Sequence, residues 1–237
     1  MSSSPSEKSG IIEKNRTYYD EIAIEYDDIL DRESSNQVVR KKVKEKFTGI
    51  IKTGTVIDFG GGTGRDLNWL AANGYKVIFC EPSEEMRNKA IDRYQNSAAA
   101  QNITFLNNNE IDFAKWDTEP PFAIKADGLL ADFAVFNCIG NIHLLFKNLA
   151  QVIKPGGHMM VLMLQLGYQK SGFWKLRKTL RSIISGKPLM INTRFKDQQQ
   201  TVYVYSSKEV KKASNAYFDI NSRENLFEFT LFHLIRK

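Results

Sequence analysis

The sequence predicts an α/β fold with a mostly parallel sheet and helices on both of its faces. Its length of 237 residues suits one domain with an elaboration. Short apolar segments alternate along the chain with amphipathic ones, as in parallel sheets whose strands are joined by helices. A glycine-rich turn at residues 60–64 lies between the first apolar strand and the helix after it. Such a turn directs free backbone N–H groups, and the positive end of a helix, at a bound ligand.

The first third of the chain is predicted to be mainly helical. Residues 1–10 are rich in serine and lack the apolar segment of a secretory signal, so they are expected to form a disordered tail. Residues 11–26 and 38–51 carry apolar side chains near helical spacing. The polar residues 31–36 between them are expected to form a loop.

From residue 55 onward, predicted strands and helices alternate. The expected strands cover residues 55–59, 76–80, 103–106, 126–133, 158–166 and 201–205. The expected helices cover residues 64–73, 84–96, 141–153, 172–185 and 208–215. Ser83 is expected to cap the second of these helices, and the sequence Lys-Pro-Gly-Gly at 154–157 to turn the chain into its next strand. Residues 217–221 and 228–237 are expected to form a closing antiparallel pair.

Composition indicates a protein with a full core and no membrane span. Hydrophobic residues make up 42% of the chain and charged residues 25%, and no apolar run approaches the roughly 18 residues of a spanning helix. A cytoplasmic location is therefore expected. Cys80 and Cys138 lie in apolar surroundings and are expected to be buried thiols. No Cys-x-x-Cys or His/Cys cluster is present, so no metal site is expected.

The net charge of +6 permits a polyanionic partner but does not require one. Much of the excess lies in two basic segments, residues 40–46 and 170–181. In the second segment, Phe173 and Trp174 are interleaved with the cations, an arrangement that suits phosphates and stacked bases. The same segment would also suit an anionic membrane surface.

The glycine spacing indicates the kind of ligand. Gly60, Gly62 and Gly64 form a G-x-G-x-G pattern, whereas a dinucleotide site requires a further glycine where this chain has Arg65. Asp58 lies two residues before the first glycine. A carboxylate there would repel a pyrophosphate but suits a ligand that carries a cationic amino group. Both features disfavour an NAD-dependent oxidoreductase.

A second carboxylate follows the second predicted strand. Glu81 is placed to accept hydrogen bonds from both hydroxyls of a ribose lying across the strand ends. Taken alone, this residue does not distinguish one nucleoside ligand from another, because several cofactors carry the same ribose.

Three ordered motifs resemble those of the class I S-adenosylmethionine-dependent methyltransferases. They are acidic-x-G-x-G-x-G after a hydrophobic strand, Tyr-Tyr-Asp-x-x-Ala-x-x-Tyr-Asp at residues 18–27, and Lys-Pro-Gly-Gly at 154–157. The resemblance, to the small-molecule or quinone-biosynthesis type, covers residues 18–164 and weakly the final hairpin. It implies a Rossmann-like, seven-stranded, mostly parallel sheet with a C-terminal antiparallel hairpin. The implied cofactor is S-adenosylmethionine, with S-adenosylhomocysteine as product.

The resemblance also implies a domain plan. Residues 11–237 would form a single methyltransferase domain. Residues 11–52 would be a helical lid over the cofactor, and residues 53–166 the cofactor-binding core. Residues 167–200 would be a substrate-facing insertion, and residues 201–237 the closing strands.

The cofactor site implied by the resemblance draws on several segments. Its expected residues are Tyr18, Tyr26, Asp58, Gly60, Gly61, Gly62, Thr63, Gly64, Glu81, Pro82, Met86, Asn109, Glu110, Asp132 and Phe133. The family usually has an aspartate that reads the adenine where this chain has Asn109. An amide offers both a donor and an acceptor to the base, and Glu110 is an alternative reader.

A sulfonium methyl is already electrophilic, so transfer depends mainly on positioning and desolvation. A general base is needed only if the acceptor begins protonated. The candidate catalytic residues are His143 and Asp132, with Tyr18 and Tyr26 as further candidates. His143 at a helix start has an alternative structural role, a bond to the backbone.

Several functions remain open from the sequence. The first is methyl transfer to an oxygen, nitrogen or carbon atom of a small molecule. The second is methylation of RNA or another polyanion through residues 170–181, although the chain has no separate RNA-binding domain and no Asn-Pro-Pro-Tyr signature. A non-catalytic binder of the cofactor is a third. The acceptor itself, and the choice between monomer and homodimer, are not specified.

Overall fold

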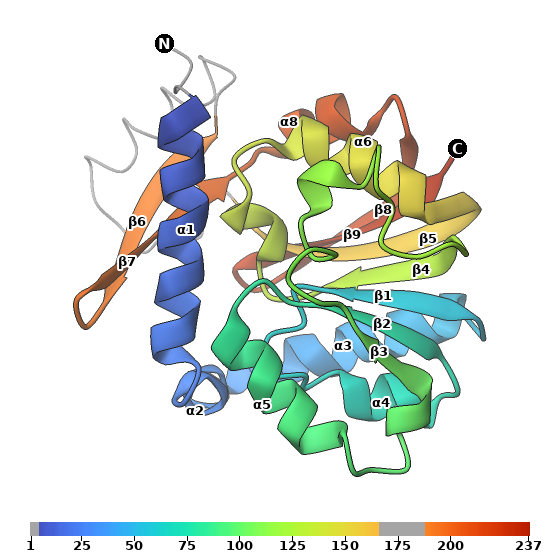
Figure 1. Cartoon of the computed structure of the whole chain (residues 1–237). Coiled ribbons are helices and arrows are strands. Elements are labelled where there is room, and N and C mark those ends of the chain that lie inside the picture. The colour runs from blue at the N-terminus through green and yellow to red at the C-terminus, as the bar shows by residue number, and fades with distance from the viewer. Residues whose placement is uncertain (1–4, 166–187) are drawn as a thin grey trace.

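A computed structural model describes residues 5–165 and 188–237 of the chain, with side chains from residue 11 onward (Figure 1). Its main sheet has seven strands in the order β3-β2-β1-β4-β5-β9-β8. These strands are β1 (Thr55–Phe59), β2 (Lys76–Cys80), β3 (Ile103–Phe105), β4 (Ala126–Ala131), β5 (Ile153–Leu164), β8 (Phe218–Leu226) and β9 (Phe229–Arg236). Neighbours from β3 to β5 run parallel, and β9 pairs antiparallel with both β5 and β8. The predicted fold class is confirmed.

Helices cover both faces of this sheet (Figure 1). The helices are α1 (Pro5–Ile22), α2 (Tyr26–Asp31), α3 (Ser34–Ile50), α4 (Leu67–Ala72), α5 (Glu84–Tyr94), α6 (Ile142–Val152) and α8 (Ser207–Ser214). Successive side chains of a strand point to opposite faces, so Ile57 and Phe59 pack with α6 and α8 while Val56 packs with α3 and α4. Each central strand is therefore apolar on both sides.

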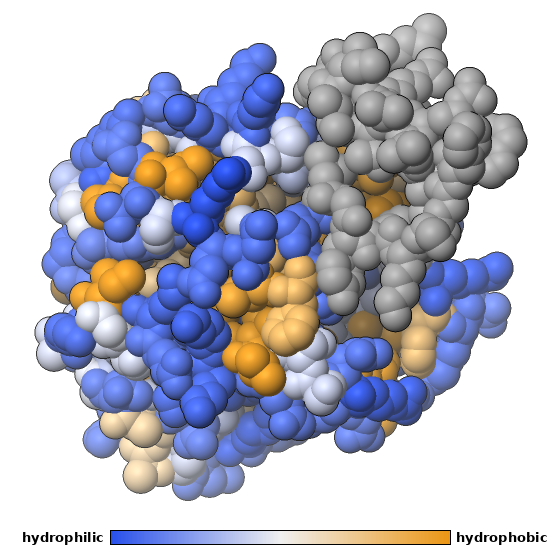
Figure 2. Space-filling view, turned by 180° about the vertical axis from the view of Figure 1, so that it is seen from behind, coloured by the Kyte–Doolittle hydropathy of each residue, from blue (hydrophilic) through white to orange (hydrophobic). Residues whose placement is uncertain are grey.

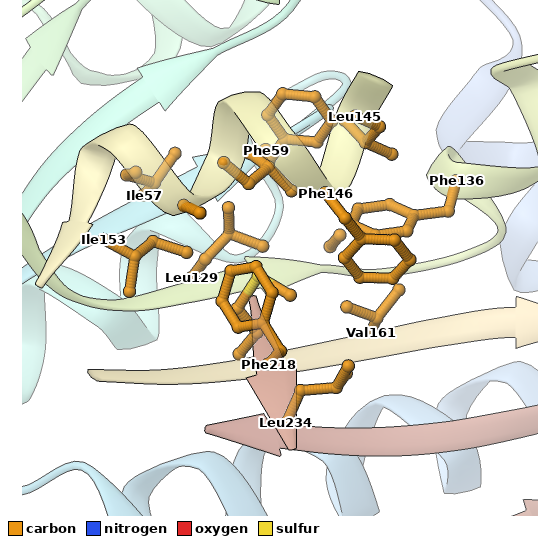
Figure 3. Packing of buried hydrophobic residues seen from close by; sticks show 14 of the residues in the cluster. Ile57, Phe59, Leu129, Phe136, Leu145, Phe146, Ile153, Val161, Phe218 and Leu234 are labelled. Atoms are coloured by element: carbon orange, nitrogen blue, oxygen red, sulfur yellow. The ribbon is translucent and has the colours of Figure 1, made fainter. Parts of the chain in front are cut away.

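The core between α6 and the sheet is dominated by aromatic and branched side chains. Figure 3 shows Leu145 and Phe146 of α6 beside Ile57, Leu129 and Val161 of three parallel strands. All five side chains are essentially fully buried, and each such burial stabilises the fold by about 1.5–3 kcal/mol. This packing fixes α6 against the sheet, with its first turn and the loop before it at the carboxyl ends of the strands.

The N-terminal helices differ from the prediction. Helix α1 begins at Pro5, so the expected tail at 1–10 is wrong for residues 5–10. The expected helix 11–26 is interrupted after Ile22, because Lys89 of α5 binds the carbonyl oxygens of Ala23 (2.9 Å) and Ile24 (3.1 Å). A cation that occupies these carbonyls replaces the intrahelical bonds that they would otherwise accept.

The polar segment 31–36 was also predicted wrongly. Helix α2 extends through Asp31 and α3 begins at Ser34, which leaves only residues 32–33 between them. Asn36 donates to the carbonyl oxygen of Leu30 (2.9 Å), so a polar side chain stabilises this tight junction.

Several core boundaries shift by a few residues. The helix expected from residue 64 begins at Leu67. Strand β4 ends at Ala131 instead of residue 133, because Phe133 (φ 47°) and Ala134 (φ 68°) have left-handed backbone. Residues 154–157 do not separate α6 from its strand; they lie inside β5, where the pairing with β4 shifts register.

The C-terminal region contains a second, two-stranded sheet of β6 (Leu189–Phe195) and β7 (Gln198–Val204), which lies beside α1 (Figure 1). The strand expected at 201–205 therefore belongs to this hairpin. Asn15 of α1 donates to the carbonyl oxygen of Thr201 (3.0 Å) and accepts from its N–H (2.8 Å), which joins α1 to β7. The helix expected at 172–185 and the basic segment 170–181 lie outside the described residues.

No helix within residues 5–165 and 188–237 combines the length and apolar character that crossing a bilayer requires. The face shown in Figure 2 is mostly hydrophilic, with its hydrophobic residues gathered in a few patches.

A buried amide connects the loop after β4 to two strands. Asn137, in the short helix Val135–Cys138, donates to the carbonyl oxygen of Tyr203 (2.8 Å) and accepts from the N–H of Leu164 (2.9 Å).

Asn137→Ala should lower the free energy of unfolding by about 2 kcal/mol, because two buried backbone groups lose their partner. Urea denaturation measures this. Asn141→Ala, which removes only the exposed cap of α6, should cost about 1 kcal/mol; equal losses would contradict the prediction.

Candidate active site

The glycine turn after β1 has a backbone that requires glycine. Gly60, Gly62 and Gly64 have φ values of 73°, 57° and 76°, a region in which residues with a Cβ are strained. A Cβ at Gly60 would lie 2.4 Å from a methyl group of Val135. The Gly60 N–H donates to the carbonyl oxygen of Cys80 (2.7 Å), so the turn lies against the end of β2.

Glu81 links this turn to the start of α5. One carboxylate oxygen accepts from the N–H of Gly62 (2.8 Å) and the other from the N–H of Ser83 (2.7 Å). Ser83 caps α5 by accepting from the N–H of Met86, as predicted. Burial raises the pKa of Glu81 to about 7, against the opposing effect of the two N–H donors. Glu81 therefore lies where the ends of β1 and β2 meet.

Two further carboxylates at this edge each have a buried oxygen without a hydrogen-bond partner among the described residues. They are Oδ2 of Asp58 at β1 and Oδ2 of Asp132 after β4. Burial and the nearby Asp66 raise the pKa of Asp58 well above its usual value and that of Asp132 to about 7. Buried polar atoms are normally paired, so each of these oxygens is an acceptor that a cationic or proton-donating ligand would satisfy.

Arg40 of α3 is a cation close to three carboxylates, an acidic group formed by Asp58, Asp66 and Asp132. Its guanidinium binds Oδ2 of Asp66 at 2.6 Å, while the Trp69 indole donates to Oδ1 at 2.8 Å. The guanidinium also lies 4.7 Å from the centre of the Phe133 ring, a cation–π contact. Arg40 was counted only in the basic segment 40–46, and this role was not predicted from the sequence. The available signal was its position next to Val39 on the buried side of α3.

Helices α1 and α2 are joined to the core by two aspartates, Asp20 and Asp27. Asp27 accepts from the Thr63 hydroxyl (2.5 Å) and from Arg93 (2.7 Å). Asp20 accepts from the Ser83 hydroxyl (2.6 Å) and from the N–H of Glu85 (3.2 Å). Both belong to the motif at residues 18–27, from which the sequence analysis selected only the tyrosines.

The two predicted lid tyrosines occupy different places. Tyr26 lies over the turn, 3.4 Å from the position of a Cβ at Gly62. Burial, and then the charge of Glu81, raise its pKa above the usual value. Tyr18 instead lies beside Thr193 of β6 and packs against the Tyr19 ring. Tyr26 is therefore brought together with the glycine turn, whereas Tyr18 faces the second sheet.

Asp27→Ala should loosen the attachment of α1 and α2 to the core. Loss of two partly buried, charge-assisted bonds should increase hydrogen exchange over residues 11–31 about tenfold. Exchange measured by mass spectrometry tests this. Asp28→Ala is the matched control, because Asp28 is exposed and its carboxylate makes no hydrogen bond to any described residue; equal exchange in both variants would count against the fastening.

The remaining predicted cofactor residues are spread around the edge. Met86 is buried against Ile22 and Ala23 of the lid, whereas Pro82 is exposed. Asn109 and Glu110 form a polar turn after β3, in which the Glu110 carboxylate accepts from the N–H of Asn107 at 2.8 Å. Neither is brought into hydrogen-bond contact with the glycine turn.

His143 lies in the first turn of α6. Its side chain is exposed and forms no hydrogen bond to any residue that the structure describes. The neighbouring Asn141 caps the helix instead. The two cysteines are free thiols, Cys80 buried and Cys138 half-buried. Within the described part of the chain, no group of three or more His, Cys, Asp or Glu side chains is arranged to hold a metal ion.

Comparisons with known proteins show the fold and the family of this chain. No curated protein sequence matches the chain. The DhpI–SAM–HEP complex is similar in structure, with a TM-score of 0.71, 17% identity and coverage of 100% of both chains. A 1,6-didemethyltoxoflavin-N1-methyltransferase of Burkholderia thailandensis with bound S-adenosylhomocysteine has a TM-score of 0.69, 12% identity, and coverage of 100% of this chain and 92% of its own.

A third similar structure is the glycopeptide N-methyltransferase MtfA with S-adenosylhomocysteine. It has a TM-score of 0.58 and 11% identity, and the match covers 83% of this chain and 89% of that one. The model of the family described as "Methyltransferase domain" matches residues 30–216. That match includes the glycine turn, Glu81, Asp132 and the strands that carry them. The chain therefore belongs to the methyltransferase domain family.

Proposed function

We propose that this methyltransferase transfers a methyl group from S-adenosylmethionine to a small-molecule acceptor. The observation that carries the proposal is the buried oxygen of Asp58 that has no partner among the described residues, beside a glycine turn of left-handed backbone. Two structural relatives support the same class of reaction: one holds 1,6-didemethyltoxoflavin with S-adenosylhomocysteine, and the other is a glycopeptide N-methyltransferase with S-adenosylhomocysteine.

The residues at this edge fit the cofactor. Asp58 would hold its ammonium group, and Glu81 its ribose hydroxyls. Asn109 or Glu110 would contact the adenine, and Tyr26 would cover the turn from the lid at residues 11–52. When bound, S-adenosylmethionine supplies an electrophilic methyl group.

Asp132 is the better placed of the two proposed catalytic residues. Its pKa near 7 lets its carboxylate take a proton from an acceptor near neutral pH, and its Oδ2 has no competing partner among the described groups. The His143 side chain forms no hydrogen bond to any described residue that would orient it. Arg40 is a positioning residue, because it contacts Phe133 directly after Asp132.

Calorimetric titration tests which cofactor the protein binds. We expect saturable binding of S-adenosylhomocysteine and none of NAD. A labelled-methyl transfer screen across phenols, amines, carboxylic acids and RNA then identifies the acceptor class. Absence of S-adenosylhomocysteine binding would refute the proposal, and labelling of RNA alone would refute its small-molecule part.

A further inference from the structure

A cavity of about 370 Å³ lies between α2, α3 and α4, next to the active-site edge. Trp69 and Phe133 supply its aromatic walls. Its charged side chains are four cations, Arg40, Lys41, Lys44 and Arg65, and one carboxylate, Asp31. The size falls in the range of small-molecule sites, about 300–1,000 Å³.

The arginines of this cavity are already paired. Arg65 binds Asp31 at 2.7 Å and the carbonyl oxygen of Asp27 at 3.1 Å. Arg40 binds Asp66 at 2.6 Å. Their geometry is fixed by these partners, and they form a rigid part of the wall.

The charges of Lys41 and Lys44 are not neutralised by a close ion pair with any described residue. Lys41 approaches only Glu45, at 4.0 Å, with both side chains largely exposed, so that contact contributes little. Lys44 forms no ion pair with any residue in the described part of the chain. The cavity therefore has two cationic side chains available to a ligand.

The cavity adjoins the catalytic edge through Phe133 and Arg40. Phe133 follows Asp132 directly and lines the cavity with its ring. Arg40 stacks on that ring from within the cavity wall and binds Asp66 of the buried acidic group. Leu30 and Asp31 of α2 also line it.

We propose that this cavity binds an anionic group, a carboxylate or a phosphate monoester, on the small-molecule acceptor. The inference rests on the proposed function, since it assigns the substrate class of that site. Lys41 and Lys44 attract the anion, and the Trp69 and Phe133 rings contact the apolar body of the molecule.

The first test is binding. Phenyl phosphate and benzyl alcohol are titrated by calorimetry into the full chain, with and without S-adenosylhomocysteine. Phenyl phosphate should bind and the alcohol should not. The double variant Lys41→Gln/Lys44→Gln should raise the Kd of phenyl phosphate about tenfold.

The control variant is Lys76→Gln/Lys125→Gln, which removes the same charge from exposed lysines near the amino ends of β2 and β4. It should leave that Kd unchanged. Failure of phenyl phosphate to bind, or equal weakening in both double variants, would overturn the inference. Binding of S-adenosylhomocysteine should be the same in all three proteins, so loss of that binding in the unmodified protein indicates failure of the proposed function instead.

The second test is turnover. Hydroxybenzoates and their methyl esters are compared as acceptors of labelled methyl. The acids should have at least about tenfold higher kcat/KM, and the Lys41→Gln/Lys44→Gln variant should lose this preference through KM. Equal use of acid and ester would exclude an anionic acceptor even if phenyl phosphate binds.

Discussion

Asp58→Asn should weaken S-adenosylhomocysteine binding by roughly 10- to 100-fold. The estimate follows from losing a hydrogen bond between charged groups, worth about 1.5–3 kcal/mol. Asparagine has the same shape, so the glycine turn should keep its backbone. Calorimetry on both proteins measures the difference.

The same substitution should stabilise the ligand-free protein. Asp58 is 2% exposed, its Oδ2 has no partner among the described residues, and Asp66, Asp132 and Glu81 surround it with like charge. A neutral amide removes the cost of burying this carboxylate and can donate to a neighbouring one.

Asp66→Asn is the matched control, because it should change the free energy of unfolding in the opposite direction to Asp58→Asn. Asp66 binds both Arg40 and Trp69, so its replacement should lower the free energy of unfolding. If Asp58→Asn lowered it as well, or left S-adenosylhomocysteine affinity intact, the assignment of Asp58 to the ammonium group would fail.

Asp132→Asn should lower kcat about 100-fold for an acceptor that must lose a proton, the lower end of the range for a general base. Because the pKa of Asp132 is raised to about 7, its carboxylate is scarce at pH 6 and dominant at pH 8. The kcat of the unmodified protein should therefore rise through pH 7, and the rise should be absent from the variant.

His143→Ala is the comparison for catalysis, with kcat expected to be unchanged. A large loss there, or an unaltered pH profile in Asp132→Asn, would transfer the proton-accepting role away from Asp132. Binding of S-adenosylhomocysteine should change little in His143→Ala.

The stability of the fold should change with pH in the opposite direction to kcat: it should fall as the pH rises. A carboxyl group whose pKa is higher in the folded state binds more protons when folded. Asp132, raised from 3.8 to about 7, and Glu81, raised from 4.5 to about 7, therefore destabilise the protein as pH rises from about 4 to about 7. Thermal unfolding should show Tm falling over this interval, less steeply in Asp132→Asn.

Local features of the chain were predicted well. The boundaries of β1 and β2 agree with the sequence pattern, and Ser83 caps α5. The turn requires glycine at positions 60, 62 and 64, as the spacing indicates. These features depend on backbone conformation, periodicity and capping, which act over a few neighbouring residues.

The arrangement of the site was much less predictable. Arg40 meets Asp66 across 26 residues, Asp27 meets Thr63 across 36, and Asn15 meets Thr201 across 186. Contacts between distant segments leave no periodic trace in either one. The left-handed backbone at Phe133 ends β4 early. It could not be predicted from the sequence, because no glycine occupies that position.

The sheet, the glycine turn and the carboxylates at the strand ends could be predicted from the chain alone, since short-range sterics and alternation of polarity specify them. The fold was needed to show which of these carboxylates have a buried oxygen without a partner among the described residues, and which cation lies beside them. Burial and charge environment depend on how α1, α2 and α3 pack against the strands. The protonation of Asp58, Asp132 and Glu81, and with it the chemistry of the site, is a property of that packing.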